Sequence, residues 1–227
     1  MKDFLKASKL YFKTAYSPGL AVVGIFLMLF NIIAILAIGW YFEEKMQIEM
    51  AMLPIPAFLH SFVIFFFQRY DRMIQNKFFL SIKNAKLYYT IVPTVVVGSV
   101  FLIFDIISFV LVLGLFNGEY AGDLLIIYSI CSVLVTFGQI AEDMPKMRAI
   151  TIFVMIFGMF FTLPVICTVM GYNQGLGLPL GIDILISLGI YTVGAALIIG
   201  IMNLWWHKSG RNLKFKEKRK SILGIEF

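Results

Sequence analysis

The sequence predicts an all-α membrane protein with six transmembrane helices, and three observations lead to this fold class. First, 60% of the 227 residues are hydrophobic and the mean hydropathy is +0.90. Second, charged residues make up only 14% of the chain, against about 25% in a typical soluble domain. Third, the apolar residues gather in runs of roughly 20, which is the length that crosses a hydrocarbon core. We therefore expect a single transmembrane domain over 1–227.

Six apolar runs are the predicted spans. They cover 19–42, 51–68, 90–116, 121–140, 149–170 and 180–206. Before this six-span bundle, residues 19–206, comes an N-terminal segment, 1–18, and after it comes a basic C-terminal tail, 207–227.

The distribution of Lys and Arg predicts the orientation of these spans. With the N-terminus in the cytoplasm, six crossings leave four segments on the cytoplasmic side: 1–18, 69–89, 141–148 and 207–227. These segments contain all of the 19 Lys and Arg residues except Lys45. Cationic residues in short loops accumulate on the cytoplasmic side of a membrane. We therefore predict a multi-pass protein of the cell membrane with both termini cytoplasmic, and the net charge of +6 reflects topology rather than nucleic-acid binding.

The N-terminal segment has the pattern of an amphipathic helix. At about 100° per residue its cationic residues fall within one narrow arc; they are Lys2, Lys6, Lys9 and Lys13. Apolar and small residues centre on the opposite side, namely Phe4, Ser8, Tyr11, Phe12 and Ala15. Such a helix is expected to lie in the cytoplasmic interface, with its ammonium groups reaching the lipid headgroups, and to end before Pro18. The alternative is a basic flank with no further role.

The second cytoplasmic segment, 69–89, mixes charged and aromatic residues and contains no Gly or Pro. We expect a helix over much of it. Ile74, Phe78 and Ile82 share one face of that helix, and such an apolar stripe needs a cover. Lipid headgroups or a partner protein could provide it.

Signatures of catalysis and of metal binding are missing from the sequence. There is no phosphate-binding loop of the form Gly-x-x-x-x-Gly-Lys-Ser/Thr, no His-Glu-x-x-His zinc motif and no Gly-x-Ser-x-Gly elbow. The two cysteines, Cys131 and Cys167, both fall inside apolar runs and have no metal-site spacing. We therefore predict no catalytic, cofactor-binding or metal site in this chain.

Three polar residues inside the predicted spans are candidates for function. Asp105 is the only acidic residue well inside a span, and such residues usually face the bundle interior or water. It could bind a cation, relay a proton or form an interhelical hydrogen bond, and the last of these is favoured. Its candidate partners are Asn31 in the first span and His60 in the second.

Small residues form a stripe in the sixth span. Ala196 and Gly200 are one turn apart, and Gly189 lies on a nearby face. Because small residues let helices approach closely, this stripe predicts either helix packing or a dimer seam.

The second cytoplasmic segment also carries a motif. Asp71-Arg72 is followed by Lys77-Phe78-Phe79-Leu80-Ser81-Ile82 and then by Tyr88 and Thr90. Together with the order of parts along the chain, this motif resembles the membrane subunit of type-II ABC exporters, and in particular its small bacterial permeases. Lys83 and Asn84 stand where Pro and Ser are usual in that group.

The resemblance implies a function and a set of partners. Residues 70–86 would form a coupling helix that docks on a separate ABC ATPase, and 2–16 would flank the docking groove. Two permease subunits, identical or paralogous, would enclose a pathway for hydrophobic or amphipathic peptides, antibiotics or lipids. ATP and Mg would bind the ATPase, and this chain would bind no cofactor directly. The coupling residues implied are Asp71, Arg72, Ile74, Lys77, Phe78, Phe79 and Ile82.

Three other functions stay open on the sequence. A vitamin importer's substrate-binding subunit can also have six helices and borrow an ATPase. A secondary carrier or channel would need inverted repeats or several intramembrane polar groups, and no clear repeat relates 19–116 to 121–206. A membrane enzyme or assembly factor is the third. A neighbouring reading frame that encodes an ATPase with a phosphate loop would favour the exporter.

Overall fold

The computed structural model describes residues 2–15, 18–42, 48, 51, 55, 85–116, 120–141, 153–154, 157–158, 165–166 and 176–208. This described part contains five long helices and no strand. They are α1 (Lys2–Ala15), α2 (Pro18–Tyr41), α7 (Ala85–Leu115), α8 (Ala121–Ala141) and α11 (Leu180–Lys208).

Four of these helices, α2, α7, α8 and α11, are long and apolar enough to cross a membrane. They correspond to the first, third, fourth and sixth predicted spans, so the chain is a membrane-embedded α-helical protein. The other two predicted spans, 51–68 and 149–170, lie almost entirely outside the described residues.

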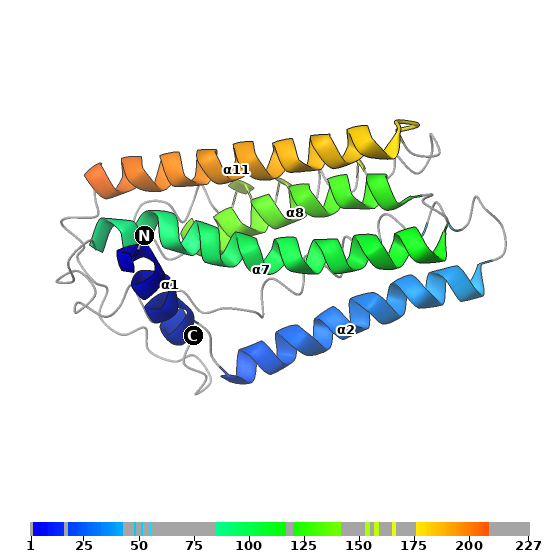
Figure 1. Ribbon diagram of the computed structural model, residues 1–227, viewed down its shortest axis with the longest axis horizontal. Coiled ribbons are helices and arrows are strands. Elements are labelled where there is room, and N and C mark those ends of the chain that lie inside the picture. Colours follow the sequence, from blue (N-terminus) through cyan, green and yellow to red (C-terminus); the bar gives the residue numbers. More distant parts are fainter. Residues whose placement is uncertain are drawn as a thin grey trace.

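The long helices lie side by side with α8 against both α7 and α11 (Figure 1). Helix α7 runs antiparallel to α8 and α11, whereas α2 runs in the same direction as α7. We call the end with the first residues of α7 and the last residues of α8 and α11 the inner end, and the opposite end the outer end. The charge pattern predicts that the inner end is cytoplasmic.

Helices α7 and α11 extend past α8 at the inner end. At a rise of 1.5 Å per residue, the 31 residues of α7 span about 46 Å and the 21 residues of α8 about 31 Å. The outer ends of α7 and α8 are aligned, because Tyr120, just before α8, packs on Phe116, just after α7. The excess length of α7 therefore lies at the inner end. Helix α7 begins at Ala85, five residues before the predicted span, and so includes residues that the sequence placed in the cytoplasmic segment.

Two apolar clusters form the core, one at each end. The inner cluster joins α1, α7, α8 and α11; its largest buried members are Tyr11, Tyr88, Tyr89, Phe101, Trp205 and Trp206. The outer cluster joins α2, α7 and α8; its largest buried members are Ile35, Phe104, Leu124, Ile127 and Tyr128. Helix α1 thus contributes to the inner cluster and α2 to the outer cluster.

Helix α1 lies across the inner end at a steep angle to the other helices (Figure 1). The helix and its end before Pro18 agree with the sequence prediction, but the predicted apolar face divides in two. Tyr11 is fully buried in the inner cluster, whereas the neighbouring Phe12 is 54% exposed. Phe12 and the exposed Leu5 therefore form a second apolar strip, beside the exposed Lys9.

The close contact between α11 and α8 occurs at a glycine that the sequence did not single out. A Cβ atom at Gly194 would lie 2.5 Å from Cγ1 of Val133. At Gly189 and Gly200 no atom would lie within 4 Å of such a Cβ. The predicted small-residue stripe therefore makes no close helix contact within the described part of the chain, and Gly194 makes it instead.

Pro93 lies inside α7, near the level at which α8 ends. A proline has no N–H group, so the carbonyl of Tyr89 lacks its usual donor four residues on. The helix nevertheless continues to Leu115. Pro93 thus separates the inner turns of α7 from the part that packs along α8.

Candidate functional site

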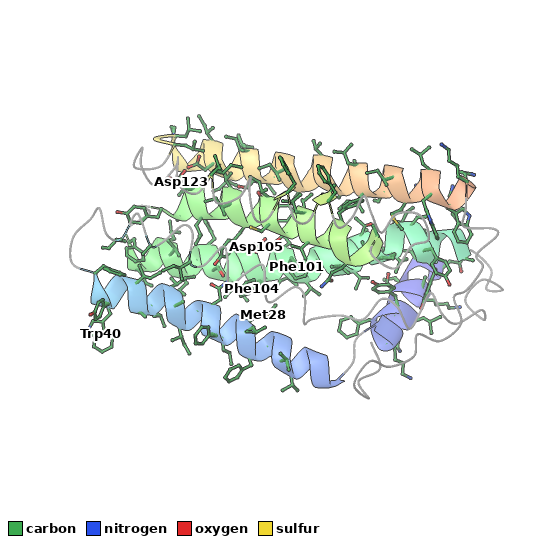
Figure 2. The ribbon with its side chains drawn as sticks, turned by 180° about the vertical axis from the view of Figure 1, so that it is seen from behind. Met28, Trp40, Phe101, Phe104, Asp105 and Asp123 are labelled. Atoms are coloured by element: carbon green, nitrogen blue, oxygen red, sulfur yellow. The ribbon has the colours of Figure 1, made fainter. Side chains whose placement is uncertain are left out.

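A cluster of buried polar side chains lies in the middle of the bundle. It draws residues from three helices: Asn31 from α2, Asp105 and Ser108 from α7, and Tyr128 and Ser132 from α8. All five side chains are essentially without solvent exposure. Asp105 lies midway along the bundle, where α7 and α8 face each other (Figure 2).

Two hydrogen bonds connect the helices of this cluster. The hydroxyl of Ser132 donates to Oδ2 of Asp105 at 2.8 Å. The hydroxyl of Tyr128 donates to Oδ1 of Asn31 at 2.9 Å, and Phe104 stacks on the Tyr128 ring with centroids 6.3 Å apart. Helix α8 is therefore bonded to α7 on one side and to α2 on the other.

The positions of these residues follow from helical spacing. Asp105 and Ser108 are three residues apart on α7, and Tyr128 and Ser132 are four residues apart on α8. Residues three or four apart share a helix face, so each helix presents one polar pair. Buried polar groups inside a membrane are costly unless they are hydrogen-bonded. The cluster can therefore hold three helices in register, and its carboxyl group can exchange a proton.

The bond between Ser132 and Asp105 should contribute measurably to stability. Ser132→Ala removes a hydroxyl donor from a fully buried carboxyl group, and we expect a loss of about 1–3 kcal/mol. Asp105→Asn keeps an oxygen that can accept the same hydrogen bond and should cost less. Thermal unfolding of the purified protein in lipid nanodiscs measures both effects.

Ser99→Ala is the matched control for Ser132→Ala. Ser99 is exposed on α7 and its hydroxyl donates to the carbonyl of Val95 on its own helix. Its removal should leave the melting temperature nearly unchanged. Equal melting temperatures for Ser99→Ala and Ser132→Ala would show that the interhelical bond contributes nothing.

An aromatic group at the inner end joins α1 to α7 and α7 to α11. Tyr11 of α1 meets Tyr88 of α7 edge to face, with ring centroids 6.1 Å apart. The next residue, Tyr89, stacks on Trp206 of α11 at 5.5 Å. Tyr and Trp are enriched at the boundary between hydrocarbon and water. The inner end thus has the side chains expected at a membrane interface, and α1 is fixed to it.

Basic side chains lie on the same helices at the inner end. Nζ of Lys86 lies 3.5 Å from Nε2 of His207. Lys6, Lys9 and Lys13 are exposed on α1. The lysines form a cationic surface at the inner end, and the described part of the chain has its lysines only there.

At the outer end, two aspartates join the first turns of α8 and α11. Oδ1 of Asp123 accepts a hydrogen bond from the backbone N–H of Leu176, just before α11, at 3.1 Å. In return, the carboxylate of Asp183 on α11 lies against Gly122 on α8, where any Cβ atom would collide with it. Carboxylates near helix N-termini are stabilised by the helix dipole. The segment just before α11 is therefore bonded to Asp123 of α8, and Asp183 of α11 packs against the first turn of α8.

The structure places some of the sequence-predicted residues and not others. Asn31 and Asp105 both belong to the central cluster, where they bond to Tyr128 and Ser132. Lys2 lies in the first turn of α1. His60 and seven coupling residues lie outside the described part; the latter are Asp71, Arg72, Ile74, Lys77, Phe78, Phe79 and Ile82.

Sequence reasoning missed Tyr128 and Ser132, although a signal was present. The connection between α7 and α8 is short, so the two helices form an antiparallel hairpin. Asp105 and Ser132 are almost equally far from that connection along the chain. Residues in such positions lie at the same depth of a hairpin, so Ser132 could have been chosen as the partner of Asp105.

The described residues include no group of three or more His, Cys, Asp or Glu side chains that could hold a metal ion. Comparison of the chain with known proteins found no matching family model, no matching curated protein and no matching solved structure. Function is therefore argued from the membrane fold and the clusters described above.

Proposed function

We propose that this chain is the permease subunit of an ATP-driven ABC exporter. The observation that carries the proposal is the attachment of α1, through Tyr11, to the first turn of α7. That turn begins at the end of segment 70–86, which is predicted to dock on an ATPase. A helix on the cytoplasmic face that is packed on the entry to a span is suited to pass motion of a docked ATPase into the membrane. ATP would be hydrolysed by the separate ATPase chain.

The directions of the helices support six crossings and cytoplasmic termini. Helices α2 and α7 run in the same direction, as do α8 and α11. The connection 43–84 therefore starts at the outer end and finishes at the inner end, and 142–179 starts at the inner end and finishes at the outer end. One further crossing in each connection accounts for this pattern. The inner end then faces the cytoplasm of a cell membrane, as the lysines favour.

The character of the membrane helices supports an apolar or amphipathic cargo and a second permease subunit. Helix α2 exposes large apolar side chains along much of its length, including Phe26, Phe30 and Ile33. A face of this kind is covered either by lipid or by another membrane subunit. The scarcity of charged residues within the described spans favours a hydrophobic peptide, antibiotic or lipid over a small ion as cargo.

Association with an ATPase tests the proposal. Pull-down of the tagged chain from native membranes should recover an ATPase with a phosphate loop. Replacing both Phe78 and Phe79 with Ala should lower the recovered amount roughly tenfold, because buried aromatic anchors dominate interface energies. Mass spectrometry of the recovered chains measures this ratio.

Val193→Ala is the control, since Val193 is exposed on α11, outside the predicted docking segment. It should recover as much ATPase as the unchanged chain. Recovery of no ATPase at all would refute the exporter function. An ATPase retained in full by the double Phe78/Phe79 variant would refute the placement of the coupling helix.

A secondary carrier is the second candidate, and the buried Asp105 favours it. An acidic side chain in the middle of a membrane bundle is a common element of proton and cation relays. Asp105→Asn separates the two functions when transport is assayed. Transport that survives the change supports a structural role in an exporter, whereas lost transport with normal expression supports a carrier.

A further inference from the structure

One face of α11 carries three polar side chains, each one turn from the next. They are Asp183, Ser187 and Tyr191, at the spacing that places residues on a single helix face. Asp183 is 5% exposed and Ser187 is 2% exposed. Oδ1 of Asp183 and the hydroxyl oxygens of Ser187 and Tyr191 are all buried, and none has a hydrogen-bond partner within the described part of the chain.

Several threonine hydroxyl groups in these helices behave differently. The hydroxyl of Thr192, also on α11, donates to the carbonyl of Leu188 at 2.8 Å. Thr90 and Thr94 on α7 likewise donate to the carbonyl one turn earlier. This is the usual way for a hydroxyl to be satisfied inside a membrane helix. Ser187 has the same opportunity and does not use it, so its hydroxyl is available to another group.

The polar face of α11 is directed at α8. Asp183, at one end of the stripe, lies against Gly122 of α8. Gly194, farther along the same face, lies against Val133 of α8. Ser187 and Tyr191 lie between these two contacts. The three oxygens therefore line the boundary between α11 and α8, starting at the outer end of the bundle.

Unpaired polar groups at this depth require a polar neighbour. An unsatisfied oxygen is energetically costly in hydrocarbon, and buried water typically satisfies such groups through about three hydrogen bonds. We propose that water enters between α11 and α8 from the outer end, forms a recess along this stripe and admits small cations.

Charge at the outer end determines the sign of the ligand. The carboxylates of Asp123 and Asp183 are close enough to interact electrostatically, and the lysines of the described residues all lie at the inner end. A recess lined by charge of one sign and walled by apolar groups concentrates ions of the opposite sign. The hydroxyls of Ser187 and Tyr191 can accept hydrogen bonds from the ion or its water. The recess does not depend on an ATPase partner, so it stands apart from the exporter function.

Cysteine labelling tests the recess directly. Ser187→Cys is made in a chain whose Cys131 and Cys167 are replaced by Ala, and the protein is placed in phosphatidylcholine nanodiscs. The probes are two water-soluble methanethiosulfonates, one with a trimethylammonium group and one with a sulfonate. We expect the cationic probe to react roughly tenfold faster than the anionic one, after correction for their rates with a free thiol in solution.

Two controls define the outcome. Val193 is 58% exposed on α11, so Val193→Cys is expected to face lipid and should react far more slowly than Ser187→Cys. Asp183→Asn in the Ser187→Cys chain should remove most of the preference for the cationic probe. If position 187 reacts no faster than position 193, the recess is dry and the proposal fails. If the charge preference is absent, or survives Asp183→Asn, the assigned ligand class is wrong.

Tyr191→Cys allows the same labelling test one turn deeper. It replaces Ser187→Cys as the test of the recess if Ser187→Cys does not give a monodisperse protein by gel filtration. Position 191 should also prefer the cationic probe and should react more slowly than position 187, because the probe must travel farther from the opening. A deeper position that reacts faster than the outer one would show that water enters from the inner end instead.

Discussion

Gly194→Ile is expected to force α11 away from α8 and to destabilise the bundle by about 3 kcal/mol, at the upper end of the usual cost of overpacking. The added Cβ would lie 2.5 Å from Cγ1 and 3.1 Å from Cβ of Val133. Val133 is β-branched, and in a helix such a side chain has a single strongly preferred rotamer. The Val133 side chain cannot rotate away from the new side chain, so the backbones of α8 and α11 must separate.

Gly200→Ile is the matched control, because it makes the same change on the same helix. A Cβ at Gly200 meets no atom within 4 Å among the described residues, and the melting temperature in nanodiscs should hardly change. Val133→Ala in the Gly194→Ile chain should recover part of the loss by making room for the new side chain. Equal melting temperatures for the Gly194 and Gly200 variants would contradict the close contact between the helices.

Tyr11→Ala is expected to release α1 from the inner end. The Tyr11 ring is fully buried in the inner cluster and packs on Tyr88. Truncation of a buried aromatic side chain costs about 3–5 kcal/mol. A helix of 14 residues is too short to hold its position by intrinsic stability, since isolated helices of that length are marginal in water. Detachment of α1 should therefore be the main result.

Distance measurements between α1 and α11 detect this release. Spin labels at positions 9 and 208 should give a narrow distance distribution in the unchanged chain and a broad one in Tyr11→Ala. Phe12→Ala is the control, because Phe12 is the next residue and is largely exposed; its distribution should stay narrow. Broadening in Phe12→Ala alone would mean that the other face of α1 holds the helix.

Hydropathy predicted the long helices well because the hydrocarbon core imposes a minimum length on any apolar span. Helix α7 begins at Ala85, five residues before the predicted span, and so includes Tyr88 and Tyr89 from the predicted cytoplasmic segment. In the structure these residues continue the helix, because their rings pack on Tyr11 and Trp206. The contact that extends the helix comes from distant parts of the chain, and local composition does not contain it.

The central cluster was predicted in part. Asp105 was recognisable because one acid in an apolar span is rare. Ser132 was not, since serine is common in membrane helices and its meaning depends on which face α8 turns toward α7. In the same way, the rotation of α11 about its own axis decides that Gly194, and not Gly200, meets α8. A single sequence contains the period of each helix but not its rotation relative to its neighbours.

Pro93 has a mechanical consequence for the inner part of α7. The helix lacks one backbone hydrogen bond there, so its bending stiffness is lowest at that point. Eight residues precede it, and they include Tyr88, on which Tyr11 rests. A force applied to α1 is therefore expected to flex α7 at Pro93 before it tilts the portion that carries Asp105.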